Sequence, residues 1–177
     1  MSRLMSVLFI VFSSLAVADD NTPALVDADW LAANLERDDL VVLDVRSGID
    51  NGGDRSTFEQ GHIPGAVYSS YTGDGWRENR DGVTGVLPPV RSLERLISSL
   101  GIANDSTVVV APAGTGPTDF GSAARVYWTF KVLGHDDVTI LNGGFAGWKA
   151  AGQEIAEGPG ERREVTQFTA KLQNELL

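Results

Sequence analysis

The stretch of sequence that decides the fold is TVVVAPAGTGPTDFGSAARVYWTFKVLGH, residues 107–135. Its first five residues, 107–111, form a β-branched run that predicts a buried central strand, and apolar positions from Ala123 to Phe130 predict a helix that starts near Gly121. A loop of Gly, Pro, Thr and Asp lies between them. Loops that join a buried strand to a helix are where α/β proteins hold anions or a nucleophile, so this loop is the first candidate site.

Strand and helix patterns alternate on both sides of this stretch. Short apolar runs at 41–45 and 138–141 predict two more buried strands, and apolar residues at helical spacing over 92–100 predict a helix between them. Residues 71–89, rich in Gly, Asp and Pro, are expected to form a long surface loop. This order is typical of an α/β domain with a mostly parallel sheet, in which ligands bind at the carboxyl ends of the strands.

The length and composition favour one packed domain behind an export signal. The chain has 177 residues, of which 42% are hydrophobic and 21% charged. Residues 1–18 combine a basic Arg3, an apolar stretch and a small-x-small site that ends at Ala18. We therefore expect a signal peptide that is cleaved after Ala18 and an exported, periplasmic domain. Contact with a membrane is expected only if the signal stays uncleaved.

The charge and the missing residue types exclude several functions. The net charge of −10 at pH 7 argues against nucleic acid as a partner, because phosphate affinity comes from clustered Lys and Arg. The chain contains no cysteine, so it offers neither disulfides nor thiolate chemistry. A Ser or Thr nucleophile would need a base, and His135, after the Gly that ends a helix, is expected to cap that helix or face solvent.

Cofactor motifs are also missing. The loop begins like G-x-G-x-x-G, but Asp119 occupies the third glycine position and would repel phosphates, and no G-K-[ST] follows. There is no H-E-x-x-H, and the two histidines are remote in sequence, so no metal site is expected. The sequence thus predicts no metal, nucleotide or other cofactor.

Five segments come in an order and spacing that resemble the rhodanese family, the sulfurtransferases. They are LDVRS at 43–47, FEQGHIPGAV at 58–67, LPPVRSLERLISSLGI at 87–102, the stretch at 107–135 and ILNGGFAGW at 140–148. The resemblance covers about residues 24–152 and is strongest to the N-terminal half of two-domain thiosulfate and 3-mercaptopyruvate sulfurtransferases. It implies a rhodanese-like α/β fold with a five-stranded, mostly parallel sheet flanked by helices on both faces.

In active rhodanese domains a cysteine opens the loop after the central strand, and the resemblance places Pro112 at that position. There the thiolate takes up a sulfane sulfur as a persulfide and passes it to a thiophilic acceptor, while loop N–H groups point at the sulfur. Proline has neither a nucleophile nor an N–H, so the resemblance implies a domain without catalytic activity. We expect it to be a scaffold for, or an interface with, a partner rhodanese domain that bears the cysteine.

The other motif residues are expected to be structural. Asp44 and Arg46 lie at the end of a strand and are expected to make charge-assisted bonds that fix neighbouring loops, with Glu59 or His62 as a partner. The turn that follows is assigned to His62, Pro64 and Gly65.

An alternative stays open at this point, a periplasmic module that binds a small anion, such as a sulfur oxyanion, or another protein. Loop N–H groups and the dipole of the following helix would attract the anion. The candidate residues are Gly114, Thr115, Gly116, Gly121, Ser122 and Arg125. A sulfurtransferase that works without cysteine is a third hypothesis, and we expect no turnover from it.

The pattern fails after Gly152. Residues 153–177 begin with a polar stretch that contains Gly and Pro and end with FTAKLQNELL. We interpret them as a linker and the start of a truncated second element.

Overall fold

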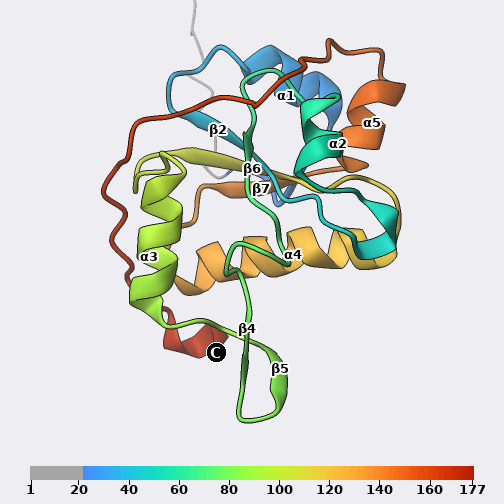
Figure 1. Ribbon diagram of the computed structural model, residues 1–177. Helices are drawn as coiled ribbons and strands as arrows, with labels where there is room; N and C mark the ends of the chain where they lie inside the picture. The colour runs from blue at the N-terminus through green and yellow to red at the C-terminus, as the bar shows by residue number, and fades with distance from the viewer. Residues whose placement is uncertain (1–21) are drawn as a thin grey trace, which may run out of the picture.

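A five-stranded sheet runs through the centre of the computed structural model, which describes residues 22–177 (Figure 1). The strand order is β1-β7-β6-β2-β3, and every neighbouring pair is parallel. The strands are β1 (Leu25–Val26), β2 (Leu40–Asp44), β3 (Val67–Tyr68), β6 (Thr107–Ala111) and β7 (Val138–Leu141). The predicted parallel α/β fold is confirmed, and β6 lies at the centre of the sheet.

Helices cover both faces of the sheet because successive side chains of a strand point to opposite sides. Val41 and Leu43 pack with α3 and α4 on one face, whereas Val42 packs with α1, α2 and α5 on the other (Figure 1). The helices are α1 (Ala28–Asn34), α2 (Arg55–Glu59), α3 (Val90–Ser99), α4 (Pro117–Val132) and α5 (Gly144–Ala150), with short 3₁₀ turns η1 (Ile49–Asn51) and η2 (Asn174–Leu176).

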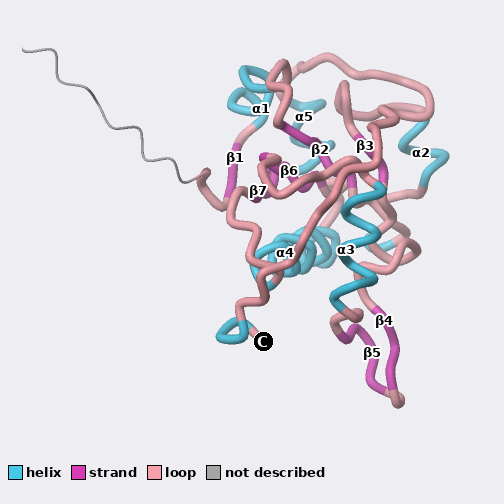
Figure 2. The backbone as a smooth tube through the Cα atoms, turned by 90° about the vertical axis from the view of Figure 1, so that its left-hand side faces the viewer, coloured by secondary structure: helices cyan, strands magenta, loops and turns pink. Residues whose placement is uncertain are grey.

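Two local predictions need correction. Helix α4 begins at Pro117, four residues before Gly121, because proline suits the first helical position and Gly116 supplies an extended N-cap. The predicted surface loop over 71–89 contains a hairpin of β4 (Glu78–Arg80) and β5 (Val83–Val86), which extends away from the main body (Figure 2).

The C-terminal strap, residues 153–177, packs along the domain although its sequence predicts a linker. It runs from α5 past α1 and down beside α3 (Figure 1). Ala156 forms an antiparallel bridge with His62, and farther along the Lys171 N–H donates to Leu133 O at 2.8 Å. The polar composition of the strap does not indicate this packing, because backbone N–H and C=O groups make most of the bonds that hold the strap. The start of a truncated second element, expected within these residues, stays a prediction.

Phe168 anchors the strap in the core. Its side chain is 3% exposed and packs against Phe130 and His135, with ring centroids 6.3 and 5.8 Å away. His135 is buried as well, so the prediction that it faces solvent is wrong. The predicted cap is present, because the His135 N–H donates to Phe130 O at 3.0 Å across the end of α4. Burial lowers the pKa of His135 below its usual value of 6.5, against the opposing effect of Asp137 and Asp136.

The predicted signal peptide, residues 1–18, lies outside the described residues. Within residues 22–177, no helix is long and apolar enough to cross a membrane.

The Phe168→Ala substitution is expected to destabilise the domain by about 3–5 kcal/mol, because it removes a buried aromatic ring and leaves a cavity. Urea unfolding followed by circular dichroism measures the change. Val165→Ala is the matched control, since Val165 lies in the same strap with 76% of its surface exposed. Equal stability of the Phe168→Ala and Val165→Ala variants would show that the strap does not belong to the folded unit.

The stability of the domain is expected to fall as the pH drops below about 6.5, because the unfolded chain then binds a proton at His135 more readily than the folded one. The lowered folded pKa means that this contribution is complete at higher pH and is lost progressively down to that folded pKa. The slope from this one group is at most about 1.4 kcal/mol per pH unit. His135→Phe should flatten the pH profile of the free energy of unfolding, and an unchanged profile would contradict the assignment.

Candidate functional site

The loop between β6 and α4 lies against the start of α5. The Phe145 N–H donates to Pro112 O at 2.8 Å, and the Ala146 N–H donates to Ala113 O at 2.9 Å. Gly144 has a φ of 55°, and a Cβ there would clash with Pro112 O. The GG pair of the ILNGGFAGW segment is therefore explained by the close approach of the two loops.

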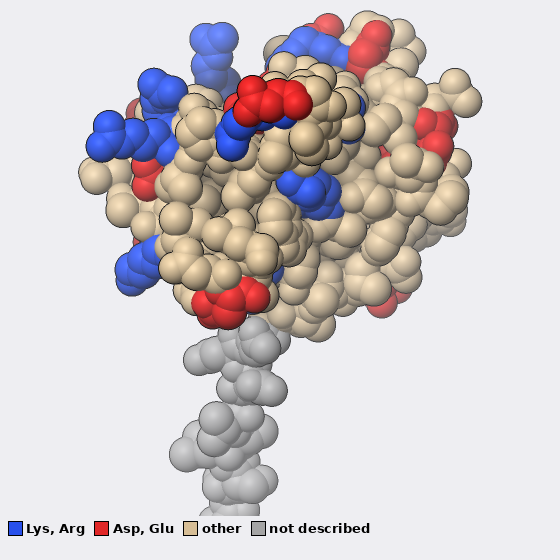
Figure 3. Space-filling view, turned by 90° about the horizontal axis from the view of Figure 1, so that it is seen from below, with Lys and Arg blue, Asp and Glu red and all other residues tan. Residues whose placement is uncertain are grey.

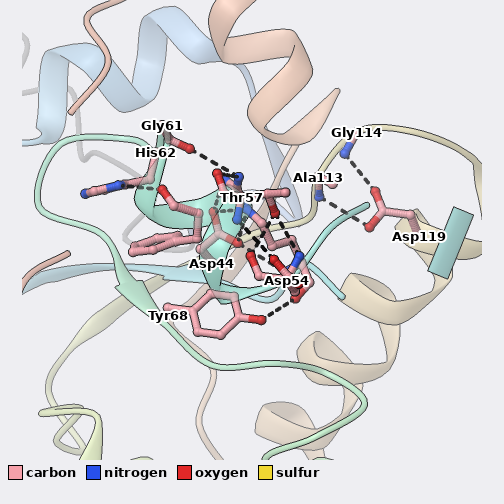
Figure 4. Close-up of polar contacts among 11 residues, drawn as sticks. Asp44, Asp54, Thr57, Gly61, His62, Tyr68, Ala113, Gly114 and Asp119 are labelled. Carbon is pink, nitrogen blue, oxygen red and sulfur yellow. Dashed lines mark hydrogen bonds and ion pairs between the residues drawn. The ribbon is translucent and has the colours of Figure 1, made fainter. Parts of the chain in front are cut away.

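The side chain of Asp119 fills the concave side of this loop. Its carboxylate accepts the N–H of Gly114 at 2.7 Å and that of Ala113 at 3.3 Å (Figure 4). It also accepts the N–H of Thr115 at 3.3 Å. Asp119 is 1% exposed. The N–H groups that a bound anion would use are thus donated to a carboxylate of the chain itself.

A second carboxylate caps α4. Asp50 Oδ2 accepts the N–H of Thr118 at 2.8 Å and the N–H of Asp119 at 2.9 Å. A Cβ at Gly116 would clash with this side chain. The first turn of a helix leaves N–H groups without an intrahelical partner and favours negative charge, so Asp50 satisfies both needs.

These contacts weigh against the anion-binding alternative, which stays a prediction. Of its candidates, only Gly114, Thr115 and Gly116 belong to the loop, and the loop N–H groups of Gly114 and Thr115 already bond to Asp119. The remaining candidates lie on α4: Gly121 is helical, the Ser122 hydroxyl donates to Thr118 O at 3.2 Å, and Arg125 donates to Gly85 O of the hairpin at 2.9 Å.

A pocket of about 290 Å³ remains beside Pro112. Its walls include Gly114, Phe120, Gly143 and Gly144, and Phe120 is 40% exposed. No thiol, imidazole or amine side chain lines it. Thr115 and Asp119 also line the pocket, and the Asp119 carboxylate already accepts bonds from the loop N–H groups.

Asp44 and Arg46 form a buried ion pair at the end of β2. Arg46 Nη2 lies 2.6 Å from Asp44 Oδ2, and Arg46 Nε lies 2.9 Å from Asp44 Oδ1. Burial raises the pKa of Asp44, and the Arg46 guanidinium opposes that rise. Arg46 also lies over the Phe145 ring, 4.4 Å from its centroid, which links β2 to α5.

The partners of Arg46 differ from those predicted. Its Nη1 donates to the backbone oxygens of Gly61 at 3.1 Å and Thr57 at 3.3 Å, instead of meeting Glu59 or His62 (Figure 4). Backbone oxygens carry no sequence signal, so residue types alone could not identify them. The pair fixes the segment that follows α2.

His62 and the Pro-Gly pair shape the next turn. His62 Nδ1 lies 3.0 Å from Phe58 O, and its ring stacks on Phe58 with centroids 4.1 Å apart. Gly65 has a φ of 73°, and the Ala66 N–H donates back to Ile63 O at 3.0 Å. Within residues 22–177, no group of three or more His, Asp or Glu side chains is placed to hold a metal ion.

Comparison with known proteins agrees with the motif set. The family profile described as "Rhodanese-like domain" matches residues 27–151. A "Probable 3-mercaptopyruvate sulfurtransferase" from Pseudomonas aeruginosa is 36% identical over 143 residues, which cover 78% of this chain and 49% of that protein. "Thiosulfate/3-mercaptopyruvate sulfurtransferase 2" from Arabidopsis thaliana is 35% identical over 133 residues, which cover 74% of this chain and 37% of that protein. The chain thus spans less than half the length of these relatives.

Solved structures share the fold. The crystal structure of the 3-mercaptopyruvate sulfotransferase SseA from Escherichia coli matches with a TM-score of 0.72 and 25% identity, over 87% of this chain and 57% of that one. A 3-mercaptopyruvate sulfurtransferase from Leishmania major matches with a TM-score of 0.66 and 20% identity, over 85% of this chain and 41% of that one.

Asp119→Ala is expected to destabilise the domain by about 1–3 kcal/mol, because it leaves buried loop N–H groups without an acceptor. Chemical unfolding measures the loss. Glu157→Ala, which removes an exposed carboxylate from the strap, should stay within about 0.5 kcal/mol of the unmodified chain. An Asp119→Ala variant as stable as the Glu157→Ala variant would mean that the loop does not depend on this carboxylate.

Proposed function

The chain belongs to the rhodanese family, and from that premise we propose that it is a non-catalytic domain that supports a cysteine-bearing rhodanese domain. It is a sulfurtransferase-like domain, and its sequence contains no cysteine. Its role is to be a scaffold for the partner or to form an interface with it. The partner is either joined to this chain or encoded separately.

One observation carries the proposal: the reactive group is missing from its position, and the Asp119 carboxylate fills the loop around that position. Sulfur transfer through a persulfide needs a thiolate, and Pro112 stands where the resemblance places it. The Asp119 carboxylate takes the N–H groups that would stabilise a negatively charged sulfur. A loop in this state lacks both the thiolate and the free N–H groups that the chemistry needs.

The relatives supply the substrate class of the proposal. Those compared above are named for thiosulfate and 3-mercaptopyruvate, and each is more than twice as long as its matched part. We assign the same class to the assembly that contains this domain. Because the sequence predicts an export signal over residues 1–18, we propose the periplasm as the location of that assembly.

The purified chain is expected to produce no thiocyanate from thiosulfate and cyanide above background, because it has no thiolate to carry the sulfur. A cysteine-bearing rhodanese domain assayed in parallel gives the positive control. Adding this chain to that domain should change its stability or its rate if the two dock. Turnover by the chain alone would overturn the proposal.

Pro112→Cys tests the role of the filled loop. The Asp119 carboxylate lies in the same pocket, so the introduced thiol should have a pKa at or above the ordinary value of about 8.5 and remain inactive. Adding Asp119→Asn removes the negative charge and should lower that thiol pKa, measured as the pH dependence of alkylation by iodoacetamide. Equal thiol pKa values in the single and double variants would rule out an electrostatic effect of Asp119.

A further inference from the structure

A second pocket lies on the far side of α2 from the loop, underneath the C-terminal strap. The strap crosses beside the edge strand β3 and the end of α3, and the space enclosed is about 320 Å³. This volume is at the lower end of the range for small-molecule sites, about 300–1,000 Å³. The polar side chains around it are Arg55, Tyr68, Ser99, Glu161, Arg162 and Arg163.

The strap is fixed before it reaches the pocket. A Cβ at Gly160 would clash with the Phe58 ring and Ala66 O, so the strap touches the core at that point. The Glu161 N–H donates to Ala66 O at 3.0 Å. Only glycine at position 160 permits this contact, which sets the height of the strap over β3.

The strap is fixed again beyond the pocket. A Cβ at Gly101 would clash with the Arg163 side chain, and the Thr166 N–H donates to Ser98 O at 3.1 Å. The Thr166 hydroxyl donates to Ile102 O at 2.6 Å. Arg162 and Arg163 therefore project from a short segment that is held at both ends, and little ordering is needed for them to meet a ligand.

Three guanidinium groups and one carboxylate surround the pocket. Arg163 lies 3.7 Å from the Glu161 carboxylate, whereas Arg55 and Arg162 form no ion pair within residues 22–177. The Arg55 guanidinium lies 4.7 Å from the centroid of the Tyr68 ring, and the Tyr68 hydroxyl donates to Arg46 O at 3.2 Å. One wall of the pocket is thus the Tyr68 ring, which its hydroxyl bond holds in place, with the Arg55 guanidinium against the face of the ring.

This positive charge stands out in a chain with a net charge of −10. Basic side chains are not spread evenly: on the face in Figure 3 they gather on the side where α3 lies. Most of them are open to solvent, as Arg91 and Arg95 on α3 are. Arg55 and Arg162 are exposed as well, but together with the half-buried Arg163 they line one half-open pocket, where guanidinium groups can bond to carboxylate or phosphate oxygens in pairs.

We propose that this pocket binds a small organic or inorganic anion with at least two negative charges. Arg55 and Arg162 supply the charges that no carboxylate of the described chain neutralises. Arg163 is already engaged, since its guanidinium lies 3.7 Å from the Glu161 carboxylate and its Nη2 donates to Asp38 O at 3.3 Å. Glu161 at the rim repels every anion in proportion to its charge, so it weakens binding without selecting between ligands. The site is independent of the loop at Pro112 and of the function proposed for it.

Calorimetry at low ionic strength, with citrate and pyrophosphate as probes, tests the site. Citrate presents carboxylates and pyrophosphate presents phosphates, so the two titrations also show which oxygen acid the pocket prefers. At least one probe should bind with a Kd below about 1 mM. The Arg55→Ala/Arg162→Ala double variant should bind it at least about tenfold more weakly, since charge-assisted bonds are lost.

Two further variants separate a built site from general attraction to a basic surface. Glu161→Gln should tighten binding several-fold, because it removes the one carboxylate at the pocket. Arg91→Ala removes an exposed cation outside the pocket and should leave the affinity unchanged. Absence of binding by both probes up to about 10 mM, or an equal loss in Arg91→Ala and in the double variant, would overturn the proposal.

Discussion

The bond between the Asp119 carboxylate and the N–H groups of Ala113, Gly114 and Thr115 determines what the loop after β6 can do. Buried N–H groups need an acceptor, and a loop that curls around a point gathers several of them on one side. In a catalytic loop of this shape the acceptor would be the charge of the reacting group. Here the chain supplies it from the first turn of α4, three residues inside the helix, so the loop keeps its curvature without a ligand.

Asp50 gives the first turn of α4 what Asp119 gives the loop, an acceptor for N–H groups that lack an intrahelical partner. Its carboxylate lies on the first-turn N–H groups of α4, which would otherwise add their partial positive charge to the loop. Two negative charges therefore occupy the two places where an anion would be most stable. Any external anion would have to displace the buried Asp119 side chain and would then be repelled by the Asp50 carboxylate. A domain that merely lacked its cysteine would not impose this free-energy cost on an anion.

Much of the fold could be predicted from the sequence because its signals are local. The β-branched runs of β2, β6 and β7 predict buried strands, whereas the order of the strands in the sheet comes from the structure. The loop could be located in the same way, and Asp119 was already conspicuous as a carboxylate in a glycine position. The role of Asp50 as a cap of α4 could not be predicted. Asp50 lies 68 residues before Thr118 in the sequence, and its backbone has an unusual φ of 48°. Phe168 was hidden for a similar reason, since a single aromatic residue in a polar stretch has no periodicity to reveal it.

A series of contacts connects the C-terminal strap to the loop at Pro112. The backbone of the strap pairs with the segment that carries His62, whose neighbour Gly61 accepts a bond from Arg46, and Arg46 lies against Phe145 at the start of α5. Phe145 in turn donates to Pro112 O. The loop that has lost its chemistry is therefore held by the same chain of contacts that positions the strap and its arginines.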